Sequence, residues 1–336
     1  VHGKDRKLPT YLNKGAEFIN GDIRNEDDVK KALDGIQAVF HLAALVGVGQ
    51  SMYDIKRYVE INSLGGAVIL DVLANVKNKV EKIVVASSMS IYGEGAYNCD
   101  ECGLVYPKLR TVEQLKKRSW EMRCPDCEKE VTAVPTSEDK PLYPTSIYAV
   151  SKRDHEEMFL RVGNAYKIPT VALRYFNIAG TRQSISNPYT GVVAIFLSRI
   201  LNNNKPVIFE DGLQSRDFIH VSDIVRANIM AMEKSEANYK VYNVGTGRNL
   251  SVLEIAKILM KRLNVELKPE IVSKFREGDI RHCFADASKI EKELGFKAEI
   301  KFESGLDELV EWAKETGADD QVEKATQELA AKGLTW

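Results

Sequence analysis

KIVVASS, at residues Lys82–Ser88, is a run of apolar and mostly β-branched residues that ends in two serines. It lacks the apolar–polar alternation of a strand with one face in water, so we expect a strand that is buried on both faces. AVFHLAA, at residues Ala38–Ala44, has the same character. Strands of this kind occur in parallel sheets whose two faces are covered by helices, so the two runs predict an α/β fold.

The segments around these two runs alternate between strand-like and helix-like patterns. This alternation is typical of a doubly wound, Rossmann-like parallel sheet, and we expect a nucleotide-binding domain over residues 1–185. The further predicted strands are Ala16–Ile23 and Pro169–Ile178, and the predicted helices are Glu26–Asp34, Arg57–Asn75 and Ile147–Tyr166.

After about residue 185 the alternation becomes less regular. We interpret residues 186–336 as a smaller α/β lobe that binds substrate and shares some segments with the first domain. The predicted strands are Pro206–Glu210, Asp217–Val221 and Val241–Val244, and the predicted helices are Gly191–Asn203, Ser222–Lys234, Ser251–Leu263, Ala287–Leu294, Ser304–Thr316 and Gln321–Lys332.

Composition argues against several classes of partner. The 336 residues carry 47 Lys and Arg against 48 Asp and Glu, a net charge of −1. This balance provides no basic surface for nucleic acid or for an anionic membrane. No apolar run approaches the roughly 18 residues of a membrane span, and the first residues lack the apolar core of a signal peptide. We therefore expect a cytoplasmic protein.

Four of the five cysteines form two pairs, Cys99-x2-Cys102 and Cys124-x2-Cys127, which are separated by 21 residues. Two such pairs, each in a turn, can complete a tetrahedral site for one Zn²⁺. A site filled by four sulfurs is structural, because it has no open position for substrate. We expect a zinc-ribbon-like insert over residues 96–135. Free thiols or two disulfides are the alternative, although disulfides are rare in the cytosol.

Tyr148 and Lys152 lie four residues apart on a predicted helix, so their side chains share one face. A phenol, with a pKa of about 10, is a poor base near neutral pH, and a nearby ammonium group lowers that pKa. The spacing alone is a weak signal. However, Ser88 ends a buried strand at the edge where α/β sheets bind their ligands. Ser88, Tyr148 and Lys152 are therefore the candidate catalytic residues.

Further segments complete a larger pattern in the order of the chain. They are Gly21–Arg24 (GDIR), His41–Leu45 (HLAAL), Asn62, Arg174–Asn177 (RYFN), Arg216–Val221 (RDFIHV) and Arg276–Asp279 (REGD). Together with the three candidate catalytic residues, they resemble the extended short-chain dehydrogenase/reductase family, in particular its NAD-dependent nucleotide-sugar epimerases and dehydratases. The resemblance covers nearly the whole chain.

The resemblance implies a role for individual residues, and it also implies a homodimer formed through the helices Arg57–Asn75 and Ile147–Tyr166. Arg216 and Arg276 suit a diphosphate because a guanidinium is planar and always charged. The expected contacts of NAD are Asp22, Ile23, Leu42, Ala43, Ala44, Asn62, Ser87, Tyr148, Lys152 and Tyr175. The expected contacts of the nucleotide-sugar substrate are Ser88, Ser90, Asn177, Arg216, Arg276 and Asp279.

Two features depart from the family pattern. The Gly-rich turn that cradles a dinucleotide, and the acidic residue that holds its ribose, have no counterpart before Gly21. We infer that about 35–40 residues of a first βαβ unit are missing from this sequence, which leaves the choice between NAD and NADP open. The second departure is the long segment between Ser88 and Tyr148, which contains the four cysteines.

The residues after Ser88 distinguish reactions within the family. Dehydratases carry an Asp-Glu pair there as acid and base, and decarboxylating members usually carry a Glu, whereas this chain has Met89 and Ser90. Because elimination then lacks its acid and base, 4-epimerisation is favoured. The segments Val46–Tyr53, Ser87–Gly95 and Ser186–Gly191 resemble dTDP-L-rhamnose 4-epimerases, with UDP-glucose 4-epimerases close behind.

Two alternatives remain open from the sequence. One is a nucleotide-sugar dehydratase or reductase of the same family. The other is a non-catalytic dinucleotide-binding protein that uses the cysteine insert to bind a partner. The complete set of Ser88, Tyr148 and Lys152 argues against the second alternative, since a scaffold would not need to keep all three residues.

Overall fold

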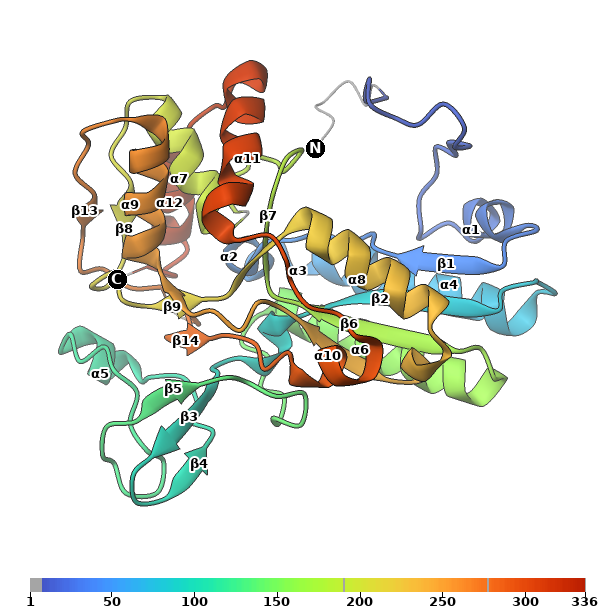
Figure 1. The fold of residues 1–336 in the computed structure, drawn as a ribbon, viewed down its shortest axis with the longest axis horizontal. Coiled ribbons are helices and arrows are strands. Elements are labelled where there is room, and N and C mark those ends of the chain that lie inside the picture. Colours follow the sequence, from blue (N-terminus) through green and yellow to red (C-terminus); the bar gives the residue numbers. More distant parts are fainter. Residues whose placement is uncertain (1–7, 190, 277, 336) are drawn as a thin grey trace.

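The computed structural model describes residues 8–189, 191–276 and 278–335 (Figure 1). Its main sheet has four parallel strands in the order β1-β2-β6-β11. The prediction of a Rossmann-like α/β fold with a parallel sheet is therefore confirmed. The strands are β1 (Ala38–His41), β2 (Lys82–Ser88), β6 (Thr170–Tyr175) and β11 (Val241–Val244).

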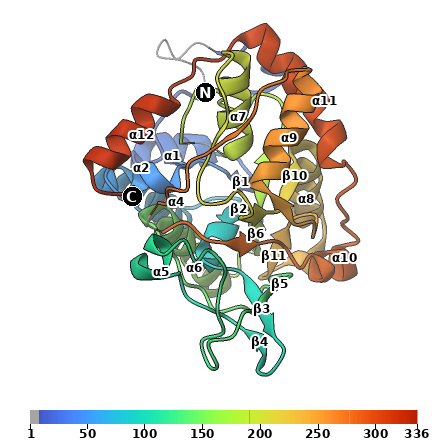
Figure 2. The same ribbon diagram turned by 90° about the vertical axis from the view of Figure 1, so that its left-hand side faces the viewer.

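Helices pack on both faces of this sheet, because alternate residues of a buried strand point to opposite sides. Val84 of β2 packs in the cluster on one face, whereas Ile83 and Val85 pack in the cluster on the other. Figures 1 and 2 show this layering. The first face is covered by α8 (Val221–Glu233) and α10 (Ser288–Leu294), and the second by α1 (Glu26–Leu33), α4 (Gly65–Asn75) and α6 (Ile147–Tyr166).

The helix predicted at Arg57–Asn75 is interrupted. It consists of α3 (Ile55–Tyr58), a π-helical turn η1 (Val59–Leu64) and α4. Such π-turns are rare and often occur at functional sites. In the part of the chain that the structure describes, no helix has both the length and the apolar character that crossing a membrane requires.

The strand predicted at Ala16–Ile23 is wrong, because these residues form an irregular segment in the structure. Within the described residues no other strand lies beside it, and a lone strand would leave its N–H and C=O groups unpaired. The strand predicted at Ala38–Ala44 is shorter than expected. β1 ends at His41, and Leu42–Ala44 leaves the sheet as a loop.

The second half of the chain forms a lobe whose core lies between α7, α9 and α11. It also contributes β11 to the main sheet and α8 to the helical layer that covers one face of this sheet, so the two lobes share segments as expected. The division at residue 185 stays a prediction. The lobe's elements are β7 (Asn177–Ala179), α7 (Val192–Leu201), β8 (Val207–Ile208), β9 (Ser215–Arg216), β10 (Phe218–His220), η3 (Ser235–Ala237), β12 (Leu250–Ser251), α9 (Val252–Leu263), β13 (Glu270–Ile271), β14 (His282–Cys283), α11 (Phe302–Thr316) and α12 (Val322–Ala331).

The segment with the four cysteines folds as a separate small unit that projects from the body of the molecule (Figure 2). Its antiparallel sheet has the order β4-β3-β5. Tyr97, Val105 and Met122 are buried in its own small core, beside Cys99 and Cys124. Its elements are β3 (Ala96–Cys99), β4 (Gly103–Val105), α5 (Val112–Lys116) and β5 (Thr132–Val134).

Candidate active site

A cavity of about 1000 Å³ lies where the C-terminal ends of β1, β2 and β6 face the second lobe. This is the edge at which parallel sheets of this type bind ligands. Ser88, Tyr148 and Lys152 all line the cavity, and the second lobe contributes Arg216 and Arg276 to its wall. The structure thus brings together the predicted catalytic and diphosphate-binding residues.

Ser88 is the last residue of β2 and caps the short 3₁₀ helix η2 (Met89–Tyr92). Its Oγ accepts hydrogen bonds from the backbone N–H of Ser90 at 3.2 Å and from the Ser90 hydroxyl at 2.9 Å. The Tyr148 phenol lies near Ser88, whose side chain lowers the pKa of this phenol by a hydrogen-bonding interaction. The two hydroxyl groups therefore lie near each other at the cavity wall.

Lys152 follows Tyr148 by one turn of α6, and only 4% of its surface is exposed. Its Nζ donates to the carbonyl oxygen of Ala86 at 2.6 Å. Burial of the ammonium group lowers the pKa of Lys152 to about 8. An ammonium has three donors, and among the described residues only the Ala86 carbonyl accepts from it, so two donors remain for a ligand.

The pKa of Tyr148 differs from the prediction. Burial of the phenol raises this pKa above its ordinary value, and the hydrogen bond with Ser88 lowers it only in part. Lys152 was expected to lower the pKa, but its ammonium lies against the carbonyl of Ala86 instead. In this structure the loss of solvation therefore outweighs the effect of Ser88 on the pKa of Tyr148.

Asn62, a predicted contact of the cofactor, does not line the cavity. It is fully buried, and its side chain bonds three groups: its Nδ2 donates to Leu45 O at 3.1 Å and to Ser151 Oγ at 2.9 Å, and its Oδ1 accepts from Leu45 N at 2.8 Å. Because all three partners lie on the loop after β1 or on α6, Asn62 positions that loop against the helix.

Three other predicted cofactor contacts also lie off the cavity wall. The carboxylate of Asp22 accepts hydrogen bonds from the backbone and guanidinium of Arg24, Ile23 packs against Gly65 in the core, and Ala43 is exposed to solvent. The remaining predicted contacts do line the cavity. They are Leu42, Ala44, Ser87, Tyr148, Lys152 and Tyr175.

All six predicted substrate contacts line the cavity, and two of them carry buried polar atoms that have no partner among the described residues. These atoms are Asn177 Oδ1 and Arg276 Nε. The Arg276 guanidinium also stacks on the Phe209 ring, 4.1 Å from its centroid. Unpartnered buried polar atoms are rare in folded proteins. A ligand with both donor and anionic groups would satisfy them.

The C-terminal helix α12 was not predicted to take part in the site. Ala325 and Leu329, on this helix, form part of the cavity wall. Glu328 anchors the helix by accepting hydrogen bonds from Tyr189 at 2.7 Å and Tyr53 at 3.2 Å. The sequence showed only a helical pattern in this tail, which does not reveal where the helix packs.

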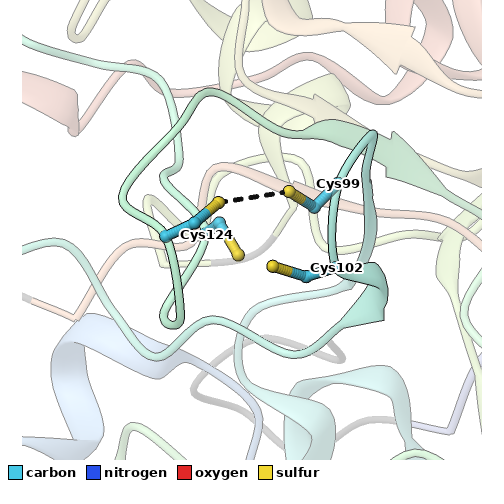
Figure 3. Close-up of side chains that lie close together, drawn as sticks. Cys99, Cys102 and Cys124 are labelled. Atoms are coloured by element: carbon cyan, nitrogen blue, oxygen red, sulfur yellow. Dashed lines mark hydrogen bonds between the residues drawn. The ribbon is translucent and has the colours of Figure 1, made fainter.

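The four predicted metal ligands come together in the insert. The Sγ atoms of Cys99, Cys102, Cys124 and Cys127 all lie within 4.8 Å of one another, and no disulfide links them. Figure 3 shows the labelled side chains around a common centre. Four sulfurs bound to one zinc at 2.3 Å lie about 3.8 Å apart, and the sulfurs of Cys99 and Cys127 are 3.5 Å apart. The cluster thus has the size of a zinc site.

Two family models together cover most of the chain. The NAD dependent epimerase/dehydratase family matches residues 1–114, and the GDP-mannose 4,6 dehydratase family matches residues 130–309. The chain belongs to the NAD-dependent epimerase/dehydratase family. The predicted family resemblance is therefore confirmed.

Relatives within the NAD-dependent epimerase/dehydratase family are similar over most of their length. A dTDP-L-rhamnose 4-epimerase from Burkholderia thailandensis is 31% identical over 90% of this chain and 83% of its own. A putative UDP-glucose 4-epimerase from Methanocaldococcus jannaschii is 33% identical over 90% of this chain and 86% of its own. The structure of a UDP-glucuronic acid 4-epimerase from Bacillus cereus, in complex with UDP-glucuronic acid and NAD, matches with a TM-score of 0.74 and 26% identity, covering 91% of this chain and 84% of that one.

Proposed function

We propose that the protein is an NAD-dependent nucleotide-sugar 4-epimerase. The observation that supports this proposal most strongly is the set of side chains around Ser88 and Tyr148 in the cavity wall. The two hydroxyl groups lie together there with Lys152 nearby, whereas Met89 and Ser90 occupy the positions of the dehydratase acid and base. Asp279 is the single acidic residue in the described wall of the cavity. A site without a second acid–base pair beside Ser88 supports epimerisation rather than elimination of water.

The residues present fit a nicotinamide cofactor. Lys152 offers two unused donors in a buried position, which suits the hydroxyl groups of a ribose. Leu42, Ala44 and Tyr175 provide an apolar wall nearby. Bound NAD supplies a group that accepts the C4 hydrogen of the sugar and returns it to the opposite face.

We propose that the chain itself binds and orients the nucleotide sugar and moves the proton of its C4 hydroxyl. As the phenolate, Tyr148 Oη takes the proton of the sugar's C4 hydroxyl, and Ser88 Oγ holds the C4 oxygen by a hydrogen bond. Burial raises the pKa of this phenol in the ligand-free structure, so the phenolate forms as ligands bind beside the Lys152 ammonium. Arg216 and Arg276 bind the diphosphate, while Asn177 accepts a hydrogen bond from the sugar nucleotide. The side chain of Asn177 then gains the partner that it lacks among the described residues.

Among the possible sugars, we propose dTDP-L-rhamnose first and UDP-glucose second. The segments Val46–Tyr53, Ser87–Gly95 and Ser186–Gly191 support this order, and so do the names of the two curated relatives. The family-model match to GDP-mannose 4,6 dehydratases makes a 4-keto-6-deoxy product the first competing outcome.

A panel of nucleotide sugars tests the proposal. Each sugar is incubated with the purified protein and NAD at about a hundredth of the sugar concentration, and the products are followed by NMR. We expect the C4 epimer of one sugar to accumulate to equilibrium, and Tyr148→Phe to slow its formation by about 10²–10⁴-fold. A 4-keto-6-deoxy product would identify a dehydratase. Conversion limited by the amount of NAD would identify a dehydrogenase.

We also propose that the cysteine cluster holds one structural Zn²⁺. The support is the size of the cluster and its position in two short turns, one of which is closed by a hydrogen bond from Cys124 N to Lys129 O at 2.8 Å. Unpaired thiols persist in a reducing compartment, which supports a cytoplasmic location.

Metal analysis of the purified protein tests the zinc proposal. We expect about one Zn per chain, and almost none in Cys102→Ser. Cys283→Ala is the matched control, because Cys283 is buried in a different cluster and should leave the zinc content unchanged. Equal zinc contents in both variants would contradict the proposal.

A further inference from the structure

Both ends of the cysteine insert are hydrogen-bonded to one segment of the substrate lobe, residues 282–286. Gly95 N donates to His282 O at 2.9 Å, and Thr136 N donates to Phe284 O at 2.8 Å. A Cβ atom on Gly95 would lie only 2.5 Å from His282 O, so this close approach requires glycine. The insert is therefore attached to the lobe along its whole base, as well as to the main sheet.

Buried charges reinforce this attachment. Glu94, at the base of the insert, accepts hydrogen bonds from the backbone N–H groups of Arg281 at 2.7 Å and His282 at 2.8 Å. Arg110, inside the insert, forms two bonds with the carboxylate of Glu210 in the lobe, at 2.7 and 2.8 Å. Both side chains of this pair are almost fully buried.

Arg281 lies at the centre of these contacts between the insert and the lobe. None of its side chain is exposed. Its guanidinium bonds Asp211 at 2.7 and 2.9 Å, reaches Glu210 at 3.1 Å, and bonds Glu121 of the insert. A buried arginine is costly unless its donors are paired. The insert and the lobe thus jointly supply the carboxylates that pair with both terminal nitrogens of one buried cation, whose Nε has no partner among the described residues.

This segment and the residues just before it also contact Arg216, one of the two predicted diphosphate-binding arginines. β14 pairs with β9, so that Cys283 lies opposite Arg216. The Arg216 guanidinium donates to the carbonyls of Ser215 at 2.7 Å, Arg281 at 2.9 Å and Ile280 at 2.7 Å. Arg110 of the insert also donates to Asp279 O at 3.2 Å, three residues after Arg276.

We infer that the cysteine insert positions the diphosphate-binding arm of the substrate lobe, with Arg110 and Glu121 as its positioning residues. The inference rests on the proposed function, since it assigns Arg216 and Arg276 to the diphosphate of a nucleotide sugar. The insert sets the path of residues 279–283, and their carbonyls fix the direction of the Arg216 guanidinium. Because a guanidinium binds phosphate through directed hydrogen bonds, a small rotation weakens binding.

Binding and kinetics of two variants test this inference. Glu121→Gln changes a half-exposed side chain, and Arg110→Lys keeps the charge but loses the paired geometry. We expect each to raise the Kd for dTDP or UDP, and the KM for the sugar substrate, by about 5–20-fold, with kcat within about twofold. Glu113→Gln, on the exposed surface of α5 in the same insert, should match the wild type. Unchanged Kd values in a folded Glu121→Gln protein would overturn the inference.

Hydrogen–deuterium exchange of the ligand-free proteins provides a readout that does not depend on the proposed function. We expect the amides of Arg281 and His282 to exchange about tenfold faster in Glu121→Gln and Arg110→Lys than in the wild type or in Glu113→Gln. Equal exchange in all four proteins would overturn the inference even if the enzyme epimerises sugars. Faster exchange in a protein that binds no nucleoside diphosphate would instead refute the proposed function and leave the coupling between insert and lobe in place.

Discussion

Lys152 shows how a single residue can serve the site at the expense of the fold. Its ammonium is buried beneath the cavity with only the Ala86 carbonyl as a described partner. Burial of a charge without a counter-ion disfavours the charged form, and this lowers the pKa of Lys152. The residue therefore costs stability at neutral pH, which is typical of a group kept for its function.

Replacing this lysine by an apolar side chain should stabilise the protein. The pKa of Lys152 is lowered from 10.5 to about 8 in the folded state, a difference of about 3 kcal/mol. The lost bond to Ala86 offsets about 1 kcal/mol. We expect Lys152→Met to raise the free energy of unfolding near pH 7 by about 1–3 kcal/mol in urea denaturation, while activity falls at least about 100-fold.

The pH dependence of this effect has a definite sign. Between pH 8 and 10.5 the unfolded chain binds a proton at Lys152 that the folded protein does not, so the contribution of Lys152 to the free energy of unfolding rises with pH in this window. The difference in the free energy of unfolding between Lys152→Met and the wild type should therefore shrink as the pH rises from 8 to 10.5. A variant less stable than the wild type near neutral pH would contradict this account.

The sequence predicts which residues form the site where a pattern places them at the end of a strand or helix. Ser88, Tyr148 and Lys152 meet in the structure because a buried strand and a helical spacing of four fixed their places in advance. Asn62 has the expected position but turns its side chain to Leu45 rather than to the cavity. Only packing decides which way a side chain points, and one sequence does not contain that information.

At the scale of elements, the π-helical turn η1 is the feature that departs most from a regular pattern. A wider turn here places Asn62, within η1, against the loop after β1 and against Ser151 of α6. The periodicity of the sequence predicted one continuous helix, because apolar spacing does not distinguish a π-turn from an α-turn. The three hydrogen bonds of the Asn62 side chain, which this geometry allows, explain the π-helical turn.

Removing the Asn62 side chain should destabilise the fold. Asn62→Ala leaves Leu45 and Ser151 without their buried partner, which should cost about 2–4 kcal/mol in urea denaturation. Ser63→Ala, on the same turn, removes one partly buried bond to Asp154 and should cost less than about 1.5 kcal/mol. Equal losses in the two variants would show that the turn does not depend on Asn62.

The strands illustrate what local sequence can and cannot predict. KIVVASS forms β2 over the predicted residues because its neighbours β1 and β6 lie on both sides. Ala16–Ile23 also contains apolar residues, but it has no strand beside it in the described structure, and it stays irregular. A strand is stable only in a sheet, so its prediction depends on distant segments.

At the scale of the whole molecule, an apolar surface in the described part of the chain is exposed to solvent. Ile55, Val59, Leu64 and Val150 are each more than 40% exposed, and they lie on α3, η1 and α6, which pack against one another. Exposed apolar patches of this kind mark protein–protein contacts. This supports the proposed homodimer through the helices around Arg57–Asn75 and Ile147–Tyr166.

Sedimentation velocity checks the homodimer. We expect the wild type to sediment at twice its chain mass of 37.7 kDa and Leu64→Glu to sediment as a monomer. Leu104→Glu is the matched control, because this leucine is also about half exposed and lies on β4 of the insert, away from the patch. A monomeric wild type, or a dimer that survives Leu64→Glu, would contradict the proposed interface.

The central claim is that the hydrogen removed from C4 of the sugar returns to the same carbon. Incubating the enzyme with dTDP-L-rhamnose, or with UDP-glucose, labelled with deuterium at C4 tests this directly by NMR and mass spectrometry of the product. The account predicts the C4 epimer with the deuterium still at C4, formed at least about 100-fold more slowly by Tyr148→Phe. A product that carries solvent hydrogen at C4, or deuterium at C6, would contradict it.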